Sequence, residues 1–128
     1  MYSGQVMAGV YIIVNKDNNI DQVTKEQVYR LFLKKTKRFQ NGIVALPYAR
    51  EEETKIRMQF NKLVLERSEQ QLRYYWARKM FSGGEHPPGI IVSEQEVIDI
   101  VSEDISAISY VSDRPSIDKV KVVLEIHE

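Results

Sequence analysis

The sequence predicts an α/β domain in three layers, with a mixed, mostly parallel sheet of about five strands and helices on both of its faces. The first observation behind this prediction is the alternation of short β-branched runs with stretches in which apolar residues recur at helical spacing. The second is that clusters of Gly, Pro, Asn and Asp separate these segments. At 128 residues the chain has the length of one ordinary domain. We therefore expect residues 9–128 to form a single domain.

The first part of the chain predicts a strand, a helix and a second strand. Residues 10–14 form a continuous β-branched and aromatic run, which is too short for a stable helix and is typical of a strand covered on both faces. Thr24 is followed by Gln27, so a capping box should begin a helix that runs to about Leu33. An Asn-Gly turn then precedes residues 43–46, which predict the second strand, with a proline after them.

Two helices are expected in the middle of the chain. Carboxylates are favoured in the first turn of a helix, so the first of the two should begin with Glu51, Glu52 and Glu53. Its apolar stripe comprises Ile56, Phe60, Leu63 and Val64. A second capping box, formed by Ser68 and Gln71, begins the next helix. We expect the buried face of that helix to comprise Leu72, Tyr75, Trp76 and Met80.

The last part of the chain predicts three strands and one helix. Residues 81–89 contain Gly and Pro pairs and should form a loop, and residues 90–92 follow as a short strand. Ser93 begins a further helix. Residues 107–111 predict a buried strand, while apolar and charged residues alternate over residues 120–126. That last strand should be wet on one face and lie near an edge of the sheet.

Eighteen basic residues balance eighteen acidic ones, so we expect neither nucleic acid nor an anionic membrane to attract the whole molecule. The charges are distributed unevenly. Residues 1–64 carry eleven Lys and Arg against six Asp and Glu, whereas residues 65–128 carry seven against twelve. This uneven distribution either steers a charged partner toward the molecule, or it belongs to solvated faces whose opposite charges largely cancel. The basic run at residues 34–38 either complements a helix C-terminus or forms a nucleic-acid patch, and the balanced total charge favours the first interpretation.

Few residues in the chain suggest catalysis or metal binding. There is no cysteine, which excludes disulfides and thiolate chemistry. The two histidines, His86 and His127, do not have the spacing of a metal site. The glycine-rich phosphate loop, the dinucleotide fingerprint and the nucleophile elbow are all missing. We therefore predict a protein that is not an enzyme and that uses no metal, cofactor or catalytic residue.

The N-terminus contains a processing signal. Val6, Met7 and Ala8 place small or compact residues where a bacterial signal peptidase reads its substrate. We interpret residues 1–8 as the remnant of a signal peptide or a disordered N-terminus, and we expect export to the periplasm.

An ordered series of short motifs then resembles one known family. The motifs are Tyr11-Ile12-Ile13-Val14-Asn15, Leu31-Phe32-Leu33-Lys34-Lys35, Arg38-Phe39, Asn41-Gly42, Arg57 with Phe60, Gln71-Leu72-Arg73-Tyr74-Tyr75-Trp76, Phe81-Ser82-Gly83, Pro87-Pro88 and Ala107-Ile108-Ser109-Tyr110-Val111. Together they resemble bacterial phosphate ABC transporter substrate-binding proteins, in particular a short, single-lobe branch of that family. The resemblance implies one lobe of a type II periplasmic-binding-protein-like fold. Full-length members have two such lobes that close on an anion.

The resemblance also implies an anion site. Arg50 and Phe60 match the separation of an Arg and a Phe that flank the family's Ser-Gly-Thr phosphate turn, which places Thr54 on the Ser and Lys55 on the Gly. The tentative ligand-binding residues are Arg50, Thr54, Lys55 and Arg57. Lys34 replaces a Gly of the family, so either the preceding helix continues or Lys34 adopts an unusual backbone angle.

Two functions follow from this resemblance. The first is a periplasmic solute-binding-protein-like module that binds phosphate, sulfate or a similar small oxyanion weakly. The second is a protein-interaction or assembly module of a bacterial envelope complex or sensor that binds no ligand. In the second case its partner is an envelope protein or another copy of the chain. Neither function involves nucleic acid or insertion into a membrane.

Overall fold

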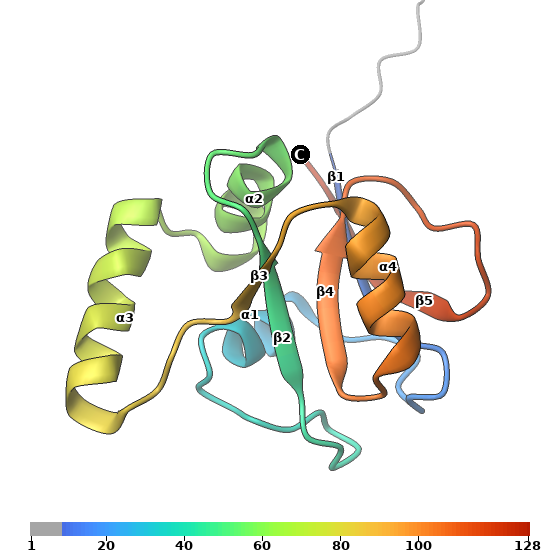
Figure 1. Ribbon diagram of the computed structural model, residues 1–128, viewed down its shortest axis with the longest axis horizontal. Coiled ribbons are helices and arrows are strands. Elements are labelled where there is room, and N and C mark those ends of the chain that lie inside the picture. Colours follow the sequence, from blue (N-terminus) through green and yellow to red (C-terminus); the bar gives the residue numbers. More distant parts are fainter. Residues whose placement is uncertain (1–8) are drawn as a thin grey trace, which may run out of the picture.

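The computed structural model describes residues 9–128, so the predicted signal-peptide remnant at residues 1–8 lies outside the described residues. Its elements are β1 (Gly9–Asn15), α1 (Lys25–Phe32), β2 (Leu46–Arg50), α2 (Lys55–Phe60), the π-helix η1 (Asn61–Leu65), α3 (Glu69–Gly83), β3 (Gly89–Ile91), α4 (Glu94–Glu103), β4 (Ala107–Val111) and β5 (Val120–His127) (Figure 1). The α/β class and the order of strands and helices are as predicted. In these residues no helix is long and apolar enough to cross a bilayer.

The five strands form one open, mixed sheet in the order β3-β2-β4-β1-β5. Strand β2 is parallel to β3 and β4, whereas β1 is antiparallel to β4 and β5. Strands β3, β2, β4 and β5 therefore run in one direction and β1 runs in the opposite one, so the sheet is mixed and mostly parallel, as predicted. Strand β1 lies between β4 and β5, and neither of these follows it directly in the chain. No crossover connection therefore forces β1 to be parallel to its neighbours. The predicted position of the last strand is confirmed, because β5 is an edge strand.

Helices cover both faces of the sheet, as predicted. Side chains of a strand alternate between the two faces, and β1 shows this directly. Ile12 and Val14 belong to the larger core, which is completed by side chains from α1, α2, η1 and α3. Ile13 belongs to a second core on the other face, to which α4 contributes Val97 and Val101. Figure 1 shows α4 in front of the sheet and α3 at the outer side, beyond β3.

The capping signals position the helices correctly. Thr24, Ser68 and Ser93 each form a capping box at the start of a helix, in agreement with the sequence. Helix α1 ends at Phe32, and Lys34 has a φ of 56° in the left-handed region. The second of the two alternatives for Lys34 is therefore the observed one.

Three local predictions were wrong. The second strand does not occupy residues 43–46 but begins at Leu46, because Pro47 lies near the start of a strand, where the missing N–H is tolerated, and does not end one. Glu51, Glu52 and Glu53 precede α2 and do not form its first turn, because Thr54 is the N-cap. Met80 is 46% exposed, since α3 contacts the larger core only through its first half.

Candidate functional site

The candidate anion site lies where β2 ends and α2 begins. The structure brings the four predicted residues together there: Arg50 is the last residue of β2, Thr54 is the N-cap of α2, and Lys55 and Arg57 belong to the first turn of α2. The Arg57 guanidinium donates through Nη1 to the Arg50 carbonyl oxygen (2.8 Å). A strand end that leads into a helix N-terminus can collect donors for an anion.

The guanidinium of Arg50 is buried and surrounded by protein acceptors. Its Nη1 donates to Glu94 Oε2 of α4 (3.0 Å), its Nε to the Ile91 carbonyl (3.3 Å) and its Nη2 to the Val92 carbonyl (3.2 Å). The Arg50 side chain is 5% exposed. A guanidinium has five N–H donors, and in Arg50 most of them already have partners within the fold.

Arg57 is paired with a second carboxylate. Its Nε and Nη2 donate to the two carboxylate oxygens of Glu69, at 2.5 and 2.9 Å, which is the bidentate geometry of a strong charge-assisted pair. Asn61 of η1 donates to the same carboxylate (2.6 Å). Glu69 is the first residue of α3, so this cluster links α2, the π-helix and α3.

The two remaining predicted residues differ from the arginines. The Thr54 hydroxyl donates to the Glu51 carbonyl (2.6 Å) and accepts from the Arg57 backbone N–H (3.4 Å), so it caps α2 and is engaged in both roles. Lys55 is exposed and forms no salt bridge among residues 9–128. Of the four candidate ligands, Lys55 is therefore the one whose cationic group faces solvent without a carboxylate partner in the described part of the chain.

An aromatic cluster of the larger core contacts the end of β2. The hydroxyl of buried Tyr110 accepts a hydrogen bond from the Arg50 backbone N–H (3.0 Å). The Tyr110 ring stacks on Phe60 with centroids 3.9 Å apart, and Phe32 packs against both. Burial raises the pKa of Tyr110 to about 12, because the ionised phenolate would be desolvated. Tyr110 thus stays protonated and holds the end of β2 in place.

Sequence reasoning missed the two carboxylates that complete the site. Of the three glutamates that precede α2, Glu52 pairs with Arg73 of α3. The carboxylates that pair with Arg57 and Arg50 are instead Glu69 and Glu94. Each is the first helical residue after a capping serine. The capping boxes predicted where these helices begin but not which arginine each helix would face.

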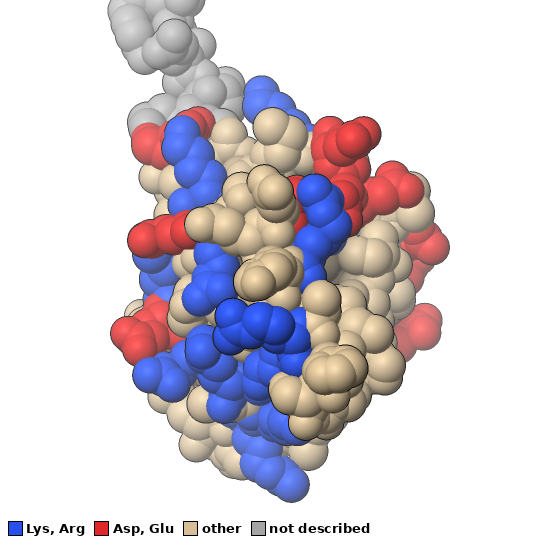
Figure 2. Space-filling view, turned by 90° about the vertical axis from the view of Figure 1, so that its left-hand side faces the viewer, with Lys and Arg blue, Asp and Glu red and all other residues tan. Residues whose placement is uncertain are grey.

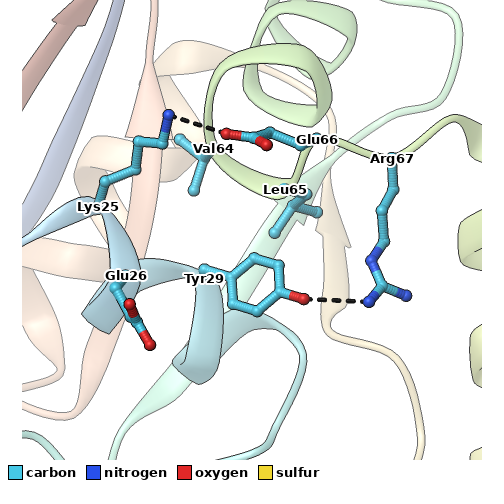
Figure 3. Close-up of a pocket in the computed structure, with 7 residues that line it drawn as sticks. All are labelled: Lys25, Glu26, Tyr29, Val64, Leu65, Glu66 and Arg67. Carbon is cyan, nitrogen blue, oxygen red and sulfur yellow. Dashed lines mark hydrogen bonds and ion pairs between the residues drawn. The ribbon is translucent and has the colours of Figure 1, made fainter.

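The described residues also form hollows away from these four side chains or beside them. An apolar groove of about 470 Å³ between α3 and β3 is lined by residues that include Trp76, Met80 and Ile90. A hollow of about 430 Å³ lies between α1 and η1 (Figure 3). In this hollow Lys25 forms a salt bridge with Glu66 at 3.1 Å, and the Arg67 guanidinium donates to the Tyr29 hydroxyl at 3.0 Å.

Metal coordination has no candidate in the described part of the chain. Residues 9–128 contain no group of three or more His, Cys, Asp or Glu side chains placed to hold a metal ion. His86 and His127 are both exposed, and Nε2 of His127 contacts Glu125 at 2.5 Å.

Comparison with known proteins bears on the fold. No protein-family model and no curated protein matches the chain, but solved structures do. One is a protein assigned as a phosphate ABC transporter substrate-binding protein from Clostridium perfringens, solved with bound phosphate, with 18% identity and a TM-score of 0.70 over 92% of this chain. Another is an ABC-type phosphate transport receptor from Vibrio cholerae, with 17% identity and a TM-score of 0.71 over 91%. A third is PstS from Borrelia burgdorferi, with 13% identity and a TM-score of 0.61 over 84%.

The fold is that of one lobe of a phosphate-transport substrate-binding protein. The chain spans 46%, 46% and 42% of the lengths of these three structures. The resemblance found in the sequence motifs is thereby confirmed at the level of fold, as is the prediction of a single lobe.

Proposed function

We propose that this chain is a solute-binding-protein-like module that acts through contacts with other proteins and is not a phosphate receptor. The observation that carries the proposal is the pairing of both site arginines with carboxylates of the chain itself, Arg50 with Glu94 and Arg57 with Glu69. A receptor needs these guanidiniums free for its ligand. Here the fold supplies the anionic partners from the first residues of α3 and α4.

The competition between ligand and carboxylate favours the carboxylate. Glu69 is held at 2.5–2.9 Å from Arg57, and a tethered group has an effective concentration at or above the millimolar range. A phosphate that approached within about 6 Å without displacing Glu69 would meet a repulsion of roughly 2.8 kcal/mol at an effective dielectric of about 20. Association carries a further entropic cost. Millimolar phosphate is therefore expected to leave these pairs intact.

Export to the periplasm, and an envelope protein or a second copy of the chain as the partner, belong to the same proposal. Support for the compartment comes from the family resemblance and from the processing signal at residues 6–8.

A second candidate function is weak binding of phosphate, sulfate or a similar oxyanion at Arg50, Thr54, Lys55 and Arg57. Two observations favour it: the four residues converge at one strand end, and one structural neighbour carries bound phosphate. In this case Lys55 would make the first contact.

Calorimetric titration with phosphate and with sulfate separates the two functions. We expect no heat of binding for the wild-type chain at millimolar ligand, and measurable heat for the double variant Glu69→Gln/Glu94→Gln, in which both arginines lose their anionic partner. Glu51→Gln is the matched control, because Glu51 is exposed and forms no salt bridge among residues 9–128. Heat with the wild-type chain that disappears in Arg57→Gln would instead establish the oxyanion site.

The interaction itself needs a separate measurement. Light scattering of the purified chain reports self-association, and crosslinking in intact cells reports a heterologous partner. A chain that stays monomeric and crosslinks to no envelope protein would contradict the proposed module.

A further inference from the structure

A cluster of cations on the outer face of the molecule serves neither the core nor the candidate anion site. Its members come from the segment after α1, from the residue before the N-cap of α3, and from the end of α3. We call this set the basic patch: Lys34, Lys35, Lys37, Arg67, Arg78 and Lys79. Figure 2 shows the face that carries α3, with Lys and Arg side chains gathered in a band on it.

The basic patch is built around one aromatic side chain. The Tyr75 ring has Arg67 Cζ at 5.2 Å, Lys35 Nζ at 5.7 Å and Lys79 Nζ at 5.9 Å from its centroid. Its hydroxyl donates to the Leu33 carbonyl (2.6 Å), which ties α3 to the end of α1. Tyr75 thus gathers cations from three separate segments in one place.

These cations are largely uncompensated. Within residues 9–128 the only salt bridge of the basic patch joins Lys37 to Glu85. Acidic residues such as Glu96, Asp99 and Glu103 lie instead on α4, which packs against the other face of the sheet. The molecule has no net charge, but the basic patch and these acidic residues of α4 lie on different faces. An anionic surface therefore orients it with the basic patch toward that surface.

Exposed apolar side chains adjoin the basic patch. Phe81, two residues after Lys79, is 96% exposed, and Tyr74 and Met80 are 69% and 46% exposed. A Phe ring beside cations suits a surface where apolar material lies next to anionic groups, as it does at the headgroup boundary of a bilayer. A free anion or a solvated acidic peptide would leave that ring in water. The cations alone would bind any of these anionic partners, and exposed Phe81 favours the bilayer surface among them.

From this juxtaposition we propose that the basic patch, with Phe81 as its apolar anchor, binds the surface of membranes that contain anionic lipids. The contact is peripheral and needs no spanning helix. It is independent of the proposed protein-interaction function, because it uses neither Arg50 nor Arg57.

Vesicle sedimentation tests the proposal with the whole chain. We expect binding to vesicles of phosphatidylcholine mixed with phosphatidylglycerol and none to phosphatidylcholine alone. Raising the ionic strength from about 0.1 M to about 1 M shortens the Debye length from about 10 Å to about 3 Å and should abolish binding. Since each surface cation contributes roughly fivefold, Arg78→Gln/Lys79→Gln should lower the partition coefficient about 25-fold. Phe81→Ser should lower it as well, without changing the salt dependence.

The matched control is Lys16→Gln/Lys119→Gln, which removes two exposed cations outside the basic patch and should change partitioning less than twofold. Thermal melts of each variant confirm that it is folded. Equal binding to both kinds of vesicle, no binding, or an equal loss in the control would overturn the proposal. So would tighter binding to single-stranded DNA or polyglutamate than to anionic vesicles, which would assign the basic patch to another polyanion.

Discussion

Replacing Glu69 by Gln tests how much the cluster at the end of β2 contributes to stability. The carboxylate accepts three hydrogen bonds, two from Arg57 and one from Asn61, and its side chain is only 21% exposed. A Gln offers one acceptor oxygen and turns an N–H toward a donor, so at least one charge-assisted bond is lost at about 1.5–3 kcal/mol. We expect the free energy of unfolding to fall by about 2–3 kcal/mol. For a domain of this length that lowers Tm by about 8–12 °C.

Urea denaturation followed by the fluorescence of Trp76 measures the change, since Trp76 packs in the core beside the first half of α3. Glu51→Gln removes an exposed carboxylate of the same chemistry and should change stability by less than about 0.5 kcal/mol. If Glu69→Gln lowered the free energy of unfolding no more than this control does, the bidentate pair would contribute nothing to stability. The inference that Glu69 keeps phosphate from binding Arg57 would then fail.

Three other predictions concern neighbouring residues. Thr54→Ala should destabilise the protein by about 1 kcal/mol through loss of the N-cap, and Thr54→Ser should retain most of the stability in the same urea assay. Lys34→Gly should raise the unfolding free energy by about 0.5–1 kcal/mol, because Lys34 has a φ of 56°; a loss of stability would contradict this. Tyr110→Phe should cost about 1–3 kcal/mol near pH 7 by leaving the Arg50 N–H without its acceptor. Burial raises the folded-state pKa of Tyr110 from 10.0 to about 12, so between pH 10 and 12 the wild type should lose a stabilisation of about 3 kcal/mol that Tyr110→Phe lacks. Parallel pH profiles of the two proteins would exclude that role.

Local signals in the sequence were sufficient for most of the fold. A capping box is a contact between residues three apart, so Thr24, Ser68 and Ser93 could be interpreted without knowing the rest of the structure. The buried strand at residues 107–111 was likewise evident from its apolar run. Pro47 misled because proline is compatible both with the end of a strand and with its beginning, and only the pairing of Pro47 with Ile108 of β4 decides between them.

The candidate site was only partly accessible from sequence. The positions of Arg50, Thr54, Lys55 and Arg57 followed from motif spacing, and the structure brings them together. The pairing of the arginines with carboxylates did not follow from the sequence, because Arg50 and Glu94, for example, are 44 positions apart. Such a pair forms only once the sheet and its two helix layers are assembled. The π-helix that places Asn61 beside Glu69 also escaped prediction, since no simple apolar period marks it.

The pairing of both arginines with carboxylates bears on which change would let the chain bind an anion. A helix N-terminus favours an anion through its free N–H groups and its dipole, and Glu69 and Glu94 are each the first residue of a helix. Each carboxylate is therefore stabilised twice, by its own helix and by the arginine that it faces. A phosphate that displaced Glu69 would gain Arg57 but would leave the carboxylate at the start of α3 without its partner, in a structure that also loses the link to Asn61. Removing the carboxylates, and not adding further cations, is for this reason the change that should allow anion binding.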